Sequence, residues 1–203
     1  PAHPADWWRD STLYIALALG VFTVAFGTRR LDASERHEGM VAAIAVESVV
    51  KLIAFVAVGI FVTWGLHDGV GDIFARAAAS AELRPLLGLG ESFDGGAWFG
   101  LTLLAMLSVI LLPRQFQMIV IENVDERHLR RASWAFPAYL LAINLFVLPI
   151  AFGGLLYFGS GGADPETFVL TLPLAAGQPV LALLAFVGGL SAATGMIIVE
   201  AIA

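Results

Sequence analysis

The sequence predicts an all-α polytopic membrane protein, and two observations on its apolar residues support this class. Of the 203 residues, 59% are hydrophobic and only 14% are charged, whereas soluble domains carry about 25% charged residues. The apolar residues also form long runs instead of periodic stripes. A spanning helix needs about 20 mainly apolar residues, and five stretches qualify: 11–28, 40–66, 98–121, 136–158 and 178–203.

The loops between these five stretches alternate in charge. Loops 29–39 and 122–133 each hold three Arg, whereas loop 67–97 is acidic and glycine-rich and loop 160–177 has no Lys or Arg. Short basic loops stay on the cytoplasmic side of a membrane. We therefore expect the first two loops inside and the other two outside. Within loop 67–97, the stretch "DIFARAAASAELRPLL" predicts a short surface helix that ends at Pro85.

Composition also argues against several classes of function. The chain has no cysteine, so it offers neither a disulfide framework nor a thiolate metal site, and its four histidines show no ligand spacing. No catalytic triad, nucleotide-binding glycine motif or basic-aromatic nucleic-acid surface is visible. We expect no catalytic residues and no metal site or cofactor, with a bound Na⁺ left open. The chain shows no signal peptide and stops inside an apolar run, so we expect it to be an internal piece of a longer protein.

Two charged residues lie within the second apolar stretch. Glu47 and Lys51 are four residues apart in "AVESVVKLIAF" and therefore share one helix face. Ionisable groups within a membrane are costly and face a bundle interior or a water-filled cavity. The pair is either a gate or ion relay, or an internal salt bridge that locks this helix to a neighbour.

The third stretch carries a polar interruption, "LLPRQFQ", at residues 111–117. Pro113 removes a backbone donor and breaks the helix, and Arg114, Gln115 and Gln117 follow at once. A helix break with polar side chains near the middle of the membrane is typical of a transporter binding site. The alternative is a kinked helix whose Arg114 side chain reaches the cytoplasmic interface.

The last stretch, "FVGGLSAATGMIIVE", has a face of small residues suited to close helix packing. Ser191 and Thr194 are three apart on that face. Their hydroxyls could help to bind a cation, or could simply donate to helix carbonyls of the preceding turn.

Three stretches in order, "TRRLDASERHEGMVAAIAVESVVKL", "LLPRQFQMIVIENVDERHLRRASWAFPAYLLAINLFVLPIA" and "GGLSAATGMIIVEAIA", resemble the sodium:solute symporter family. The nearest likeness is the transporter-like membrane domain of CbrA-type sensor histidine kinases. The resemblance implies a LeuT-like bundle of two inverted five-helix repeats, of which this chain would supply core helices four to eight. Residues 1–66 would end the first repeat, 67–97 would connect the repeats, and 98–203 would begin the second.

The resemblance also implies a function. "LLPRQFQ" is similar to the unwound section of core helix six, which makes Arg114, Gln115 and Gln117 candidate substrate-binding residues. The family carries neighbouring hydroxyl residues on core helix eight that help to bind sodium. Here Thr194 is followed by Gly195 and Met196, so sodium coupling is expected to be weak or absent.

We therefore expect a transport or sensing domain for a small polar solute such as an amino acid, in a bacterial-type inner membrane and linked to a histidine kinase. No enzymatic activity is expected of this chain itself. Its expected partners are the solute, the lipid bilayer and the remaining helices of the same protein, and no nucleic acid. The alternatives are a sodium:solute symporter without a kinase, and a membrane sensor or scaffold that does not transport.

Overall fold

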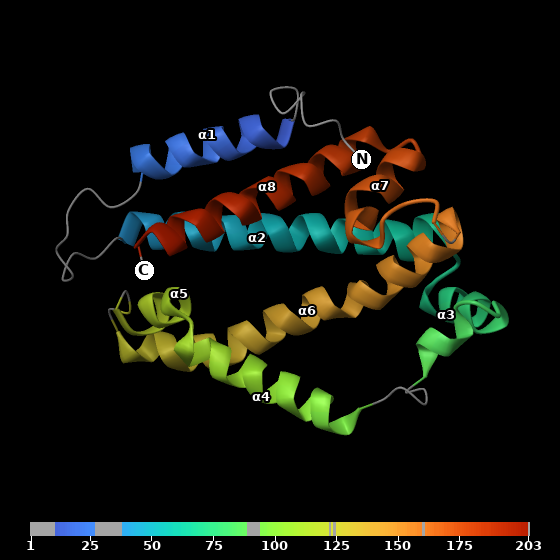
Figure 1. Cartoon of the computed structure of the whole chain (residues 1–203), viewed down its shortest axis with the longest axis horizontal. Helices are drawn as coiled ribbons and strands as arrows, with labels where there is room; N and C mark the ends of the chain where they lie inside the picture. Colours follow the sequence, from blue (N-terminus) through green and yellow to red (C-terminus); the bar gives the residue numbers. More distant parts are fainter. Residues whose placement is uncertain are drawn as a thin grey trace.

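The computed structural model describes residues 11–26, 38–88, 94–121, 123, 125–159 and 161–202, and every regular element among them is helical. The longest helices are α2 (Glu38–Ile60), α6 (Glu126–Phe158) and α8 (Pro179–Ile202), with α2 continuing as a π-helical segment, η2 (Phe61–Leu66) (Figure 1). In the described part of the chain, three helices are long and apolar enough to cross a membrane: Val41–Leu66, Glu126–Phe158 and Pro179–Ile197. The chain is therefore an integral membrane protein.

The other two expected spans correspond to shorter helices. Helix α1 (Ser11–Phe26) has 16 residues and α4 (Gly95–Leu111) has 17. At 1.5 Å per residue each is about 25 Å long, less than the ~30 Å hydrocarbon core of a bilayer. After α4 the chain continues as two short pieces, α5 (Pro113–Phe116) and η4 (Gln117–Ile121). Five spans and a LeuT-like arrangement thus stay predictions.

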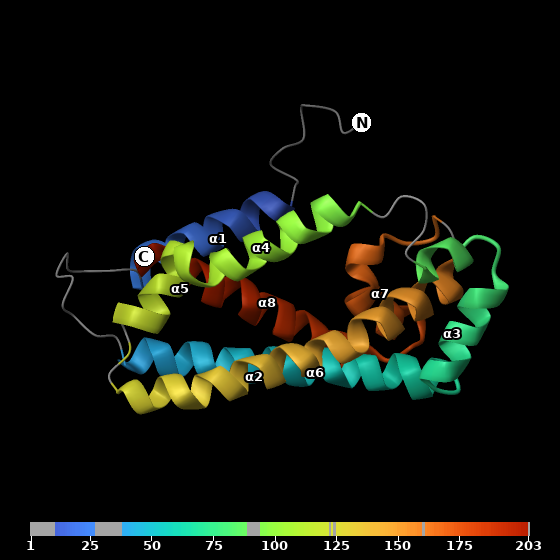
Figure 2. The same cartoon turned by 90° about the horizontal axis from the view of Figure 1, so that it is seen from below.

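The ends of the helices follow the alternation expected from the loop charges. Helices α2 and α6 both begin at one end of the molecule (Figures 1 and 2). Helix α3 (Val70–Ala79) and helix α7 (Phe168–Ala175), with its preceding 3₁₀ turn η5 (Pro165–Thr167), lie at the opposite end. The predicted loops 67–97 and 160–177 therefore share one side of the helix layer. Which side faces the cytoplasm stays a prediction.

Two expected boundaries are wrong by several residues. The surface helix ends at Ala79, where Ser80 turns to an extended conformation, and Pro85 lies instead in a separate 3₁₀ turn, η3 (Arg84–Leu87). Helix α6 begins at Glu126, ten residues before the expected start at 136. The Asp125 carboxylate accepts a hydrogen bond from the Arg127 amide at 2.8 Å, and this N-cap starts the helix within the basic loop.

The internal prolines of α6 do not end the helix. Pro137 and Pro149 both lie inside its 33 residues, and Pro149 is buried. The helix ends at Phe158 because Gly159 takes a φ of 67°, a conformation that glycine adopts without steric cost. The segment 160–177 is also not a plain loop, since α7 occupies most of its second half.

A tightly packed core joins the last turns of α2 and η2 to α6, α7 and α8. We call it the packed end, and its buried residues are Val58, Val62, Phe146, Ile150, Phe168, Leu172 and Ala185. Two glycines allow this close packing: a Cβ on Gly59 would overlap the Phe146 ring, and a Cβ on Gly154 would overlap the Phe168 ring. Helix α3 is attached to α6 by a smaller cluster of buried residues, Ile73, Ala77, Leu83 and Phe152.

Residues 95–121, here called the α4–α5 arm, contrast with this core. Helix α4 lies apart from α2 and α8 in Figure 1 and apart from α2 and α6 in Figure 2. Its apolar side chains are largely exposed, with Leu104 at 64% and Met106 at 67%. The arm therefore presents its apolar surface to lipid or to another polypeptide segment.

Candidate functional site

The α4–α5 arm contains the expected helix break. Helix α4 ends at Leu111, Leu112 has φ −73° and ψ 127°, and α5 begins at Pro113. Pro113 has no N–H to donate to the carbonyl of Val109. The amides of Gln115 and Phe116 both donate to the Leu112 carbonyl at 3.0 Å. In a continuous α-helix the Gln115 amide would instead donate to the Leu111 carbonyl. The break thus leaves backbone carbonyls without their helical donors.

The polar side chains that follow the break differ in how far the structure describes them. Gln115 and Gln117 are half-buried. The backbone of Arg114 belongs to α5, but its side chain lies outside the described part of the chain. Helix α5 contacts α8 and lies beside its C-terminal part. The structure therefore brings the break next to the helix that carries Ser191 and Thr194.

A second polar contact joins α2 to α8. The Thr194 hydroxyl lies 3.3 Å from Oε1 of Glu47, across the interface between the two helices. It is also within reach of the Ser191 carbonyl at 2.9 Å and the Leu190 carbonyl at 3.2 Å. Glu47, Ser191 and Thr194 are all half-buried. A carboxylate, a hydroxyl and a backbone carbonyl thus converge at one place within two of the spanning helices.

Gly195 makes room for this carboxylate. A Cβ built on Gly195 would collide with Oε2 of Glu47. The sequence draws attention to Gly195 as a missing hydroxyl ligand, and the structure gives it a steric role. Any larger residue at 195 must push the Glu47 side chain away from Thr194.

Glu47 and Lys51 do not pair with each other. Among the side chains that the structure describes, no ion pair within 4.0 Å joins them, and Glu47 faces α8 instead. The backbone of Lys51 lies beside Gly188, whose Cβ position is 3.8 Å from the Lys51 Cα. Among the described side chains, therefore, Glu47 and Lys51 do not form a salt bridge with each other. The expected close packing of α8 through Gly188 is present, since its Cβ position is 2.7 Å from the Ala54 Cβ.

The oxygens near the Thr194 hydroxyl come from the Glu47 carboxylate and from two backbone carbonyls of α8. In the described part of the chain, no group of three or more His, Asp or Glu residues could hold a metal ion. Sodium, however, is bound by hydroxyl and carbonyl oxygens as well as by carboxylates. Weak or absent sodium coupling at Ser191 and Thr194 stays a prediction.

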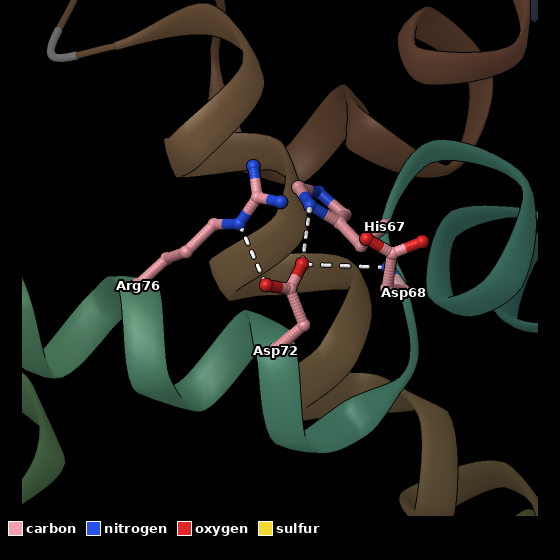
Figure 3. Close-up of polar contacts among 4 residues, drawn as sticks. All are labelled: His67, Asp68, Asp72 and Arg76. Atoms are coloured by element: carbon pink, nitrogen blue, oxygen red, sulfur yellow. Dashed lines mark hydrogen bonds and ion pairs between the residues drawn. The ribbon is translucent and has the colours of Figure 1, made fainter.

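A third cluster, which the sequence did not predict, lies at the corner between η2 and α3 (Figure 3). His67 follows η2, and its side chain is only 6% exposed. Its Nδ1 is 4.0 Å from Oδ2 of Asp72, and neither ring nitrogen has a hydrogen-bond partner. Asp72 Oδ1 accepts from Nε of Arg76 at 2.8 Å, and Oδ2 accepts from the amide of Asp68 at 3.3 Å.

Arg76 controls the charge of this cluster. Its hydrogen bond to Asp72 holds the pKa of that carboxyl below the usual value of 3.8, and the same bond raises the pKa of Arg76. Asp72 is therefore ionised throughout the neutral and mildly acidic range. The sequence signal was the four-residue spacing of Asp72 and Arg76, which places them on one face of α3, shortly after His67 and Asp68.

Comparisons with protein-family models, curated proteins and solved structures find no match for this chain. Its function is therefore inferred from the residues at the helix break and at the α2–α8 interface.

Proposed function

We propose that the chain is a membrane domain that binds a small polar solute, such as an amino acid, for transport or for sensing. The observation that carries this proposal is the helix break at Leu112, with Gln115 and Gln117 directly after it. An unwound segment within an apolar helix is costly at membrane depth unless protein or a water-filled cavity satisfies its backbone groups. A polar solute that accepts and donates hydrogen bonds would satisfy them equally well.

The chemistry at the break suits a zwitterionic solute. The carbonyls near Leu111 can accept from an ammonium group, and the amides of Gln115 and Gln117 can both donate and accept. An Arg guanidinium at position 114 can form two parallel hydrogen bonds with a carboxylate. We therefore assign Arg114, Gln115 and Gln117 to the solute site.

The contact between Glu47 and Thr194 is connected to this site through α8. Helix α8 touches both α2 and α5, so a shift of α8 would alter the break and the Glu47 contact together. An ionisable group inside a span is a functional candidate by default. We propose that Glu47 acts as a gate or ion-linked contact, with Ser191 and Thr194 as weak cation ligands at most.

The resemblance to the sodium:solute symporter family supports the same proposal. On that basis the chain would form core helices four to eight of a LeuT-like bundle in a bacterial inner membrane, connected to a sensor histidine kinase. Neither catalysis nor a cofactor is proposed for the chain itself. A plain symporter without a kinase and a sensor that does not transport are the competing functions.

The test uses the full-length protein in proteoliposomes. A panel of radiolabelled amino acids is screened for binding and uptake, and the best ligand is then measured with Arg114→Ala, Arg114→Lys and Gln115→Ala. We expect Arg114→Ala to weaken binding by tenfold or more, about 1.4 kcal/mol, and Lys to restore little because it lacks the planar fork. Leu104→Ala, on the exposed face of α4, is the matched control and should bind normally.

The outcomes separate the competing functions. Binding without uptake would favour a sensor that does not transport, whereas uptake that falls tenfold when choline replaces sodium would favour a sodium symporter. Normal binding by a well-folded Arg114→Ala protein would remove Arg114 from the site. If no amino acid binds and the Gln115→Ala protein behaves like the wild type, the proposed solute class is wrong.

A further inference from the structure

His67 occupies an unusual environment for a polar side chain. It lies at the end of η2, where the chain leaves the membrane-spanning helix and turns into α3. Burial of both ring nitrogens without a hydrogen-bond partner costs free energy, because the lost bonds to water are not replaced. The arrangement is stable only because the surrounding packing holds the ring in place.

The glycine of a neighbouring helix provides the space for the ring. A Cβ on Gly153 of α6 would lie 3.3 Å from Nε2 of His67 and would overlap Val62. The stretch 144–158 of α6 and the whole of α7 contain no acidic or basic residue. The charged groups near His67 are therefore those of the corner itself: Asp68, Asp72 and Arg76 (Figure 3).

The geometry points to a protonation-dependent latch. We propose that protonation of His67 draws its Nδ1 onto Oδ2 of Asp72, which tightens the corner between η2 and α3 and holds α3 on α6. The 4.0 Å separation is too long for a hydrogen bond and needs about 1 Å of closure to reach bonding distance. Asp72 keeps its charge while His67 gains one, because Arg76 stabilises the carboxylate.

The direction of the pH effect follows from the charges. Histidine ordinarily changes charge between pH 5 and 8. An imidazolium finds a carboxylate beside it only when α3 is in place, and the proposed latch requires this attraction to outweigh the water contacts that the buried ring gives up. By linkage, acid therefore favours the docked state, and the added stability is lost as the pH rises.

The latch acts on the same contacts that fix α3. Ile73 and Ala77 are fully buried against the Phe152 region of α6, and Phe74 packs against Phe152 at a ring-centroid distance of 5.6 Å. Ala75, two residues from Ala77, is exposed. One helix thus offers both a buried position that reports undocking and an exposed reference position. The inference is independent of the proposed solute function.

The experiment exploits the absence of cysteine from the chain. Ala77→Cys and Ala75→Cys proteins in nanodiscs are labelled with a charged maleimide at pH 8.0 and pH 5.5. The labelling rate at Ala77→Cys is divided by the rate at Ala75→Cys. This ratio cancels the pH dependence of thiol reactivity and measures how often α3 undocks. We expect this ratio to fall about threefold at pH 5.5, within the range for a partly exposed ion pair.

Two variants test the partners. His67→Gln retains a polar side chain of similar length but does not titrate, and Asp72→Asn retains the backbone hydrogen bond but not the charge. Both should reduce the pH effect to less than about 1.5-fold. The latch is wrong if the wild-type ratio is constant or rises in acid, or if either variant keeps the full effect. Should His67→Gln fail to fold, Asp72→Asn at the exposed corner decides alone.

Discussion

The packed end and the α4–α5 arm contain the same kinds of apolar residue but bury them very differently. At the packed end Phe168 is 1% exposed and Leu172 is fully buried, whereas on the arm Leu104 and Met106 are about two-thirds exposed. The packed end also has glycines fitted against aromatic rings. Gly100, on the arm, has no neighbour within 4 Å of its Cβ position.

The packed end is fixed by contacts within the chain. The α4–α5 arm instead depends on lipid or on another polypeptide segment to cover its apolar side chains. The helix break lies on the arm, so the candidate solute site is attached to the least constrained element of the described structure. Elements with few buried contacts open and move most readily. A solute could therefore reposition α5 against α8 without disturbing the packed end.

The largest expected effect comes from a substitution in the core of the packed end. Phe168→Ala should lower the free energy of unfolding by about 3 kcal/mol, at the low end for this substitution because lipid can replace part of the lost contact. Phe99→Ala, at a site 64% exposed on the arm, is the control and should change it little. Unfolding in mixed detergent micelles measures both, and equal losses would contradict the contrast between the two regions.

Adding a methyl group, instead of removing a side chain, should also distinguish the two regions. Gly154→Ala should destabilise by about 1–3 kcal/mol, because the new Cβ would overlap the Phe168 ring. Gly100→Ala should be neutral or stabilising by up to about 1 kcal/mol, since alanine favours helix and the site is open. A stable Gly154→Ala protein with unchanged unfolding would mean that the packed end can relax around the methyl group.

A third substitution tests the contact between α2 and α8 and removes no side chain from the core. Gly195→Ala should displace the Glu47 carboxylate from Thr194, and we expect a change in solute affinity or uptake of about tenfold, or 1.4 kcal/mol, with little loss of stability because a flexible side chain can move. Gly189→Ala, on the same helix with nothing within 4 Å, should behave like the wild type. Identical transport by the two variants would remove Glu47 from the mechanism.

The smallest effect concerns the corner beside α3. The carboxyl of Asp72 should titrate below 3.8 because Arg76 hydrogen-bonds it, and Arg76→Gln should raise its pKa toward 3.8. A depressed pKa in the folded state means that the ion pair stabilises above the unfolded value and is lost as the pH falls through the folded value. NMR titration of ¹³C-labelled aspartate measures this, with Asp164, whose carboxylate accepts from the Glu166 amide, as the reference. An Asp72 midpoint that Arg76→Gln leaves unchanged would contradict the prediction.

Features that depend on local chemistry could be predicted from the sequence. The membrane class follows from composition, and the helix break at Leu112 follows from the missing N–H of Pro113. The start of α6 could not be placed as easily, because the polar residues after Asp125 are compatible with a solvated loop as well as with a helix. The N-cap at Asp125 was the available signal.

Contacts between distant residues could not be predicted in this way. Glu47 and Thr194 are 147 residues apart in the chain, and only the packing of α2 against α8 brings them together. Lys51, four residues from Glu47, was the obvious local partner, yet the carboxylate faces the space left by Gly195. The burial of His67 likewise depends on Gly153 of another helix.

The length of α6 has a mechanical consequence. Its 33 residues make a rod about 50 Å long, some 20 Å longer than the hydrocarbon core of a bilayer. Its second half is held by Phe146 and Ile150 in the packed end, while its first turns are exposed and carry Arg127, Arg130 and Arg131. A pivot of about 10° at Ile150, some 36 Å from Glu126, would move that end of α6 by roughly 6 Å. Such a pivot would turn a small rearrangement around η2 and α7 into a displacement of several ångströms at the basic end of α6.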